Sequence, residues 1–262
     1  LFSVSIFLLA RPAAFGLESQ SAAIQLTFVL VGIWWAVFSL PLLVWVKERH
    51  TGAPPVVGAF RAGLRQLRGT VRSLGADRNL LWFLAAYWLY IDGVYTIIKM
   101  AVDYGLSQGL SATDVTGAIL LTNFIGFPAA IGFGVLGQRL GARQAIYLAL
   151  AVYIVATLFA VFLTTVVEFY ALAATIGLVQ GGVQSLSRSL YARLIPPEKS
   201  GEYFGFFNML GKFSSILGPV LAGTAALVTG SQRVGILSIL VLFVSGLWLL
   251  TRVRVPAARA AR

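Results

Sequence analysis

The sequence predicts an all-α fold, a polytopic bundle of transmembrane helices. Of its 262 residues, 58% are hydrophobic and only 11% are charged. Ordinary globular domains are about 45 to 50% apolar and about 25% charged. The apolar residues also fall into blocks of about 20 residues, the length that a helix needs to cross a bilayer. Together, composition and block length predict an integral membrane protein.

Eight apolar segments follow one another along the chain, and seven of them are long enough to span a bilayer. They cover residues 1–10, which form a shortened segment, and then 24–46, 80–101, 115–136, 145–165, 169–190, 203–228 and 234–251. The chain begins at Leu1 without the basic start of a signal peptide. We therefore expect a piece of a longer protein whose earlier helices precede this sequence.

The net charge of +11 is unevenly distributed between the connections. Basic residues gather in the long connection at 47–78, at 139–143, at 188–199 and after residue 251. The other connections hold the acidic residues Glu18, Asp103, Asp114 and Glu168. Positively charged loops remain cytoplasmic. The long loop and the C-terminus are therefore expected inside, with the last six helices alternating in direction. The charge reflects topology and not a nucleic-acid partner. The excess of Arg over Lys indicates a GC-rich bacterial source, so we expect the protein in a bacterial cytoplasmic membrane.

The alternation divides the chain into four regions: residues 1–46 with two helices, a cytoplasmic linker at 47–79, a six-helix bundle at 80–252, and a basic tail at 253–262. Within the linker, apolar residues recur at helical spacing, and arginines follow the same steps. These are Phe60, Leu64, Leu67, Val71 and Leu74, with Arg61, Arg65, Arg68 and Arg72. This pattern is typical of an amphipathic helix that lies on an anionic inner leaflet. A solvated basic linker is the alternative.

Several classes of protein are excluded by composition. The chain has no cysteine and only one histidine, His50, so thiolate zinc sites and cysteine nucleophiles are ruled out. Asp92 is the only carboxylate deep inside a span, which leaves no set of nucleophile, base and metal ligands at one depth. We expect no enzyme activity, no cofactor and no metal site.

A short turn after residue 136 carries the first motif, GVLGQRLGAR at 134–143. It resembles the loop signature G-x-L-x-D-R-x-G-R-R of the major facilitator superfamily, with Gln138 and Ala142 in place of its aspartate and one arginine. Glycines permit a tight turn, and arginines at the inner surface meet the carbonyl ends of neighbouring helices. An ordinary basic turn is the other interpretation.

The second motif, QGGVQSLSRSLYARLIPPEKSGEYFGFF at 180–207, is longer. It resembles the autophagy-related vacuolar effluxer family, a branch of the major facilitators, as does YIDGVYT at 90–96. The resemblance implies a major facilitator-type bundle truncated to about 8 of 12 spans. It also implies a monomeric secondary transporter that moves a small polar solute by alternating access, such as an amino-acid effluxer. An exporter of drug-like molecules and a non-transporting receptor or scaffold remain alternatives.

Polar residues inside the second motif lie on one edge of a helix. Gln180 and Gln184 either contact solute or hydrogen-bond to a neighbouring helix. A parallel stripe of small residues, Gly177, Gly181, Ser185 and Ser189, lets another helix approach closely. The expected gating residues at the cytoplasmic ends are Gly134, Arg139, Gly141, Arg143, Arg188, Arg193 and Glu202.

Two charges inside the spans carry the strongest functional expectation, because buried charges in a bilayer are costly and usually paired. Helical rise puts Asp92 about 18 Å and Lys212 about 14 Å from the inner surface. We expect them to pair, with Asp92 taking up a proton or cationic group and Lys212 serving as counter-ion or holding a solute carboxylate. A purely structural pair is the alternative.

Two proline-containing sequences predict interruptions in the spans, at 126–128 and at 218–219. Asn123 and Asn208 precede them by a turn or more, so both amides are expected to line the solute cavity. Static kinks without a functional role are the alternative.

Overall fold

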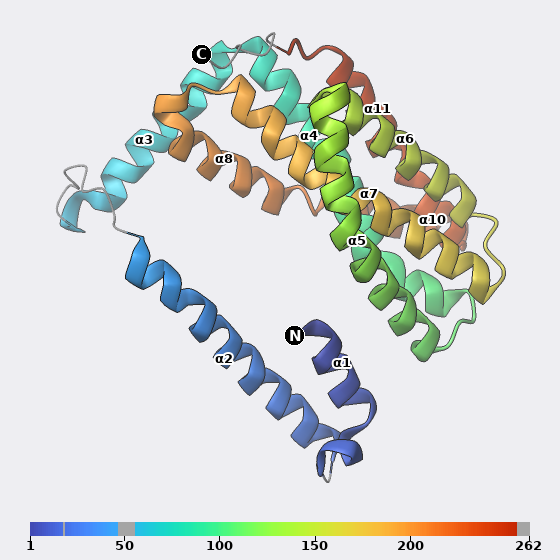
Figure 1. Cartoon of the computed structure of the whole chain (residues 1–262). Coiled ribbons are helices and arrows are strands. Elements are labelled where there is room, and N and C mark those ends of the chain that lie inside the picture. Colours follow the sequence, from blue (N-terminus) through green and yellow to red (C-terminus); the bar gives the residue numbers. More distant parts are fainter. Residues whose placement is uncertain (18, 47–55, 256–262) are drawn as a thin grey trace. The chain divides into compact units, whose positions relative to one another are not determined.

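The computed structural model describes residues 1–17, 19–46 and 56–255 (Figure 1). Helices are the only regular secondary structure in these ranges. Within these ranges, seven stretches are long and apolar enough to cross a membrane, the same number as the complete spans expected from the sequence. The all-α fold is thereby confirmed, and the chain is an integral, multi-pass membrane protein.

The chain forms two units, residues 1–60 and 61–262. In the first unit, α1 (Phe2–Ala10) is followed by the 3₁₀ turn η1 (Pro12–Phe15) and by α2 (Gln20–Trp45). Ser19 caps α2, because its hydroxyl accepts the N–H of Ala22 at 3.2 Å. Among the described residues of this unit, α2 is the membrane-spanning candidate.

The second unit begins within α3 (Val56–Ala76) and contains the remaining helices. They are α4 (Arg78–Ser107), α5 (Ala112–Leu140), α6 (Ala142–Ala160), α7 (Val166–Leu194), the 3₁₀ turn η2 (Pro197–Lys199), α8 (Ser200–Phe213), α9 (Leu217–Thr229), α10 (Gln232–Ser238) and α11 (Leu240–Thr251). α8 and α9 share one apolar stretch, and so do α10 and α11. Short turns connect the long helices, which run back and forth across the bundle (Figure 1).

The helix starts follow from capping side chains. Asp77 accepts the N–H groups of Asn79 and Leu80 at the start of α4, and Ser111 accepts that of Asp114 at the start of α5. Side-chain oxygens at this position satisfy donors that the helix itself leaves unpaired. The connections between the spans are therefore defined by the local sequence.

Small residues let α5 and α7 pack against each other. A Cβ added at Gly177 would lie 2.8 Å from the carbonyl oxygen of Thr122, and one added at Gly181 would lie 2.9 Å from the Cβ of Ala130. In a bilayer, where water does not drive helices together, such close backbone contact holds spans together. The expected small-residue stripe on α7 is confirmed at these two glycines.

An aromatic cluster joins α4, α7 and α8. The rings of Tyr87 and Phe207 stack at 4.1 Å between centroids, and those of Tyr191 and Phe207 at 4.6 Å. The buried hydroxyl of Tyr191 also donates to the backbone oxygen of Tyr203 at 2.9 Å. These contacts fix α8 against the body of the unit.

One of the two expected interruptions occurs, slightly before its expected position at 218–219, and the other does not. α5 is continuous through Pro128, so the predicted break at 126–128 is wrong. The other span is broken at residues 214–216, just before Gly218, and Pro219 lies in the first turn of α9. Pro128 leaves only one backbone carbonyl of α5 without its helical hydrogen bond, and a spanning helix tolerates this. Pro219 lies in the first turn of α9, where the backbone N–H that proline lacks has no partner within the helix.

Candidate functional site

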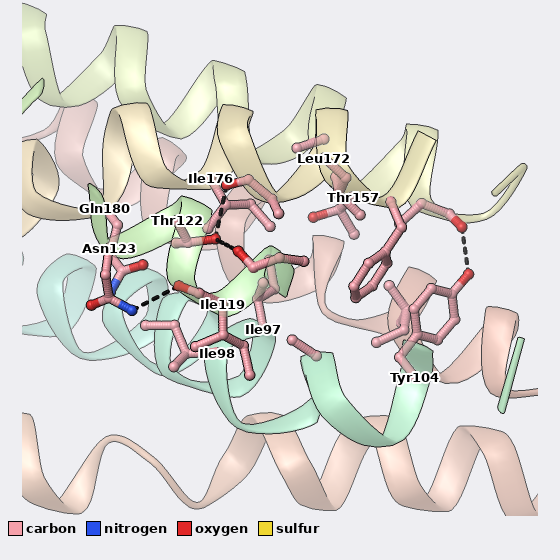
Figure 2. A pocket seen from close by; sticks show the side chains of 17 residues that line it. Ile97, Ile98, Tyr104, Ile119, Thr122, Asn123, Thr157, Leu172, Ile176 and Gln180 are labelled. Carbon is pink, nitrogen blue, oxygen red and sulfur yellow. Dashed lines mark hydrogen bonds between the residues drawn. The ribbon is translucent and has the colours of Figure 1, made fainter. Parts of the chain in front are cut away.

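A cavity of about 230 Å³ lies among α4, α5, α6, α7 and α10 (Figure 2). Most of the side chains around it are apolar, including Ile97, Ile119, Leu172 and Ile176. None of the 17 residues that line it is charged. The polar groups are few: Tyr104, Thr122, Asn123, Thr157 and Gln180. Such a lining, apolar with a few polar groups, is typical of small-molecule sites.

Most of these polar groups already form hydrogen bonds with backbone oxygens of the protein. The hydroxyls of Thr122 and Thr157 bond to carbonyls of their own helices, Thr122 also reaches Ala173 O at 3.1 Å, and Tyr104 donates to the backbone of Ala160. The Nδ2 of Asn123 donates to Ile119 O at 2.8 Å.

The amide of Gln180 makes no hydrogen bond within the described ranges, and Figure 2 shows it beside Asn123. The Gln180 amide and the Asn123 carbonyl are thus the groups in the cavity that remain available to a solute. The structure brings together these two of the six side chains expected to bind solute or ion.

Asp92 lies elsewhere, inside the packed core of the second unit. Its side chain is 0% exposed. Oδ1 accepts the backbone N–H of Gly218 at 3.0 Å and lies 3.3 Å from the hydroxyl of Thr96. Oδ2 is buried and has no hydrogen-bond partner among the described residues. The carboxylate therefore contacts the start of α9 and not the cavity.

Lys212 does not reach Asp92. It lies on the exposed side of α8, two residues before the break, and no ion pair joins the two residues in the part of the chain that the structure describes. The expected pair is thus corrected: similar depth along two helices does not place two side chains on facing sides. Asn208, also exposed, and the half-buried Gln184 lie outside the cavity lining.

Residues expected at the cytoplasmic ends gather at the end of the bundle where α4 begins. Arg143 donates to the backbone oxygen of Val253 at 2.7 Å, just beyond α11, as an arginine near a helix C-terminus is expected to do. Gly141 forms the turn between α5 and α6 with φ +90°, a conformation that favours glycine. Gly134 instead lies within α5.

The remaining members of that set lie on α5, α7 and α8. Arg139, Arg188 and Arg193 are exposed. The carboxylate of Glu202 accepts the hydroxyl of Thr70 on α3 at 3.0 Å. α3 is therefore anchored to the start of α8, a contact that the sequence did not predict.

The linker helix itself is confirmed in part. α3 covers the expected amphipathic stretch, with Leu74 buried and Arg65, Arg68 and Arg72 exposed. The side chain of Arg61 lies outside the described residues, as do the residues at 47–55 and the tail at 256–262. Leu67 and Val71, expected on the apolar face, are exposed.

Sequence reasoning missed Tyr104, Thr122 and Thr157 in the cavity and Thr96 beside Asp92. Thr96, Thr122 and Thr157 are polar residues within apolar stretches, which is the signal that could have found them. Tyr104 follows Asp103, beyond the expected span at 80–101. No three of the His, Asp and Glu side chains in the described ranges lie close enough to hold a metal ion.

Comparison with known proteins identifies the family. Residues 1–262 match the model of the vacuole effluxer Atg22-like family. An uncharacterized MFS-type transporter of Bacillus subtilis, YxiO, is 34% identical over 95% of this chain and 58% of its own length. Autophagy-related protein 22-2 of Emericella nidulans is 26% identical, over 92% of this chain and 46% of its own length. The chain thus spans about half the length of these curated relatives, and it belongs to the vacuole effluxer Atg22-like family.

Proposed function

We propose that the full-length protein is a secondary active transporter of the major facilitator type that exports a small solute by alternating access. Family membership along the whole chain carries this proposal, because the family is named for a vacuole effluxer and the bacterial relative for an MFS-type transporter. The expected absence of enzyme activity is part of the same proposal.

The cavity beside Asn123 and Gln180 is the proposed solute site within this part of the protein. Its lining has no charge, so it suits the neutral or apolar part of a solute. The Gln180 amide offers both a donor and an acceptor. An amino acid would need its charged ends bound by groups outside this cavity, for which the exposed Lys212 and Asn208 on α8 are candidates.

The uncharged lining also favours a second candidate, the export of an apolar, drug-like molecule. Such a molecule needs no ionic partner and gains from apolar contact. A solute panel that includes both classes distinguishes the two candidates.

We further propose that the protein functions as a monomer in a bacterial cytoplasmic membrane, with α3 and the C-terminus inside. The exposed arginines of α3 would then lie beside anionic lipid headgroups. Proton coupling through Asp92 has less support, because the carboxylate faces backbone at the start of α9 and not the cavity.

The test is solute flux in proteoliposomes that contain the full-length protein, with amino acids and apolar compounds as the panel. Gln180→Leu is expected to lower flux of the transported solute at least about tenfold, the effect of losing a buried hydrogen bond to a ligand. Gln184→Leu, on the same helix but outside the cavity, is the matched control and should change flux little. Equal effects of the two variants would contradict the proposed site, and no flux of any solute would contradict the function.

A further inference from the structure

The span that contains α8 and α9 is interrupted in its middle, where backbone groups need partners. α8 ends at Phe213 and α9 begins at Leu217, although both lie in one apolar stretch, 197–229. In a bilayer, N–H groups freed by such a break must be satisfied inside the protein, because no water is available. The first turn of α9 therefore needs an acceptor.

The local sequence does not supply that acceptor. Ile216 is the N-cap residue of α9, and its aliphatic side chain makes no cap hydrogen bond. Pro219 has no N–H to satisfy. The N–H of Gly218, at the second position of the helix, is one that a capping side chain usually accepts.

Asp92 supplies the acceptor from α4. Its Oδ1 lies 3.0 Å from the Gly218 nitrogen, and both residues are buried. The packing is so close that a Cβ at Gly218 would clash first with the hydroxyl of Thr96, and would lie 2.8 Å from the Cβ of Thr96 and 2.9 Å from Oδ1 of Asp92. Glycine at 218 therefore allows both Thr96 and the carboxylate of Asp92 to approach the backbone here.

We infer that Asp92 is a positioning residue that caps α9 from the neighbouring helix and holds the break between α8 and α9 in place. A negative group at a helix N-terminus is also favoured by the helix dipole. The property that matters most is an acceptor oxygen at this point, so asparagine can serve where leucine cannot. This role does not depend on the transported solute.

Amide hydrogen exchange of residues 217–222, measured on the purified full-length protein in detergent micelles, tests the inference. Asp92→Leu should speed exchange in this segment at least about tenfold, because the first turn loses its cap. Asp92→Asn should remain within about threefold of the unchanged protein. Asp103→Leu removes an exposed carboxylate from the same helix and is the matched control.

Two results would overturn the inference: wild-type protection in Asp92→Leu, or exchange in Asp92→Asn as fast as in Asp92→Leu. If Asp92→Leu does not fold, Asp92→Asn decides alone, since a folded and protected asparagine variant supports capping and an unprotected or unfolded one contradicts it. Gly218→Ala should also speed exchange, because the added Cβ would clash with Thr96 and with the carboxylate of Asp92 and so separate α4 from the start of α9. Normal protection in this variant would contradict the geometry.

Discussion

Replacing Gly177 with alanine should loosen the contact between α5 and α7. The added Cβ would lie 2.8 Å from the carbonyl oxygen of Thr122 and 3.1 Å from its Cα, and both are backbone atoms that cannot rotate away. Ordinary contact begins at 3.4 Å, so α5 would have to move by about 0.6 Å. Overpacking of this kind costs about 1–3 kcal/mol.

The same substitution also gains helix propensity, which is worth about 0.8–1 kcal/mol over glycine. Gly132→Ala isolates that gain, because nothing lies within 4 Å of its Cβ. The two variants should therefore differ by about 1–3 kcal/mol in unfolding free energy, with Gly177→Ala the less stable. Unfolding in SDS, followed by tryptophan fluorescence, measures the difference. Equal stability, or greater stability for Gly177→Ala, would refute close packing at this position.

Two further predictions concern hydrogen bonds between helices. The hydroxyl of Ser187 donates its proton to a carbonyl of its own helix. The buried hydroxyl of Tyr90, which lies 2.7 Å from the Ser187 oxygen, is therefore the donor between the two side chains. Ser187→Ala should lower the free energy of unfolding by about 1–3 kcal/mol, because it leaves that donor unpaired. Adding Tyr90→Phe should recover at least about 1 kcal/mol in a double-mutant cycle, and purely additive losses would argue against the bond. Tyr203→Phe removes the 3.0 Å contact with Ser73 on α3 and should speed tryptic cleavage after Arg72 about 2- to 10-fold; an unchanged rate would show that this contact does not anchor the linker helix.

The sequence predicted the number and position of the spans well, because hydrophobic blocks and helix caps are local features. Ser111 and Asp77 illustrate this, since each caps a helix only a few residues away. The tight turn at Gly141 could also be predicted from the sequence, because a turn with positive φ favours glycine.

The side that each polar residue faces was much harder to predict. The estimated depths of Asp92 and Lys212 along their helices suggested a pair, but Lys212 faces outward and Asp92 meets the backbone of α9. That outcome depends on the break at 214–216, which frees a donor at the depth of the carboxylate. Gln180 and Gln184 differ in the same way, since only Gln180 lines the cavity.

The central claim is that a solute occupies the cavity beside Asn123 and Gln180, and thiol labelling tests it most directly. Since this part of the protein contains no cysteine, Asn123→Cys can be introduced into the full-length protein after removal of any other cysteines. The new thiol should react with a water-soluble maleimide, and a saturating concentration of the transported solute should slow that reaction. Gln138→Cys, exposed on the same helix and outside the cavity, should be insensitive to solute. An unreactive thiol at position 123, or one that solute does not protect, would contradict the account.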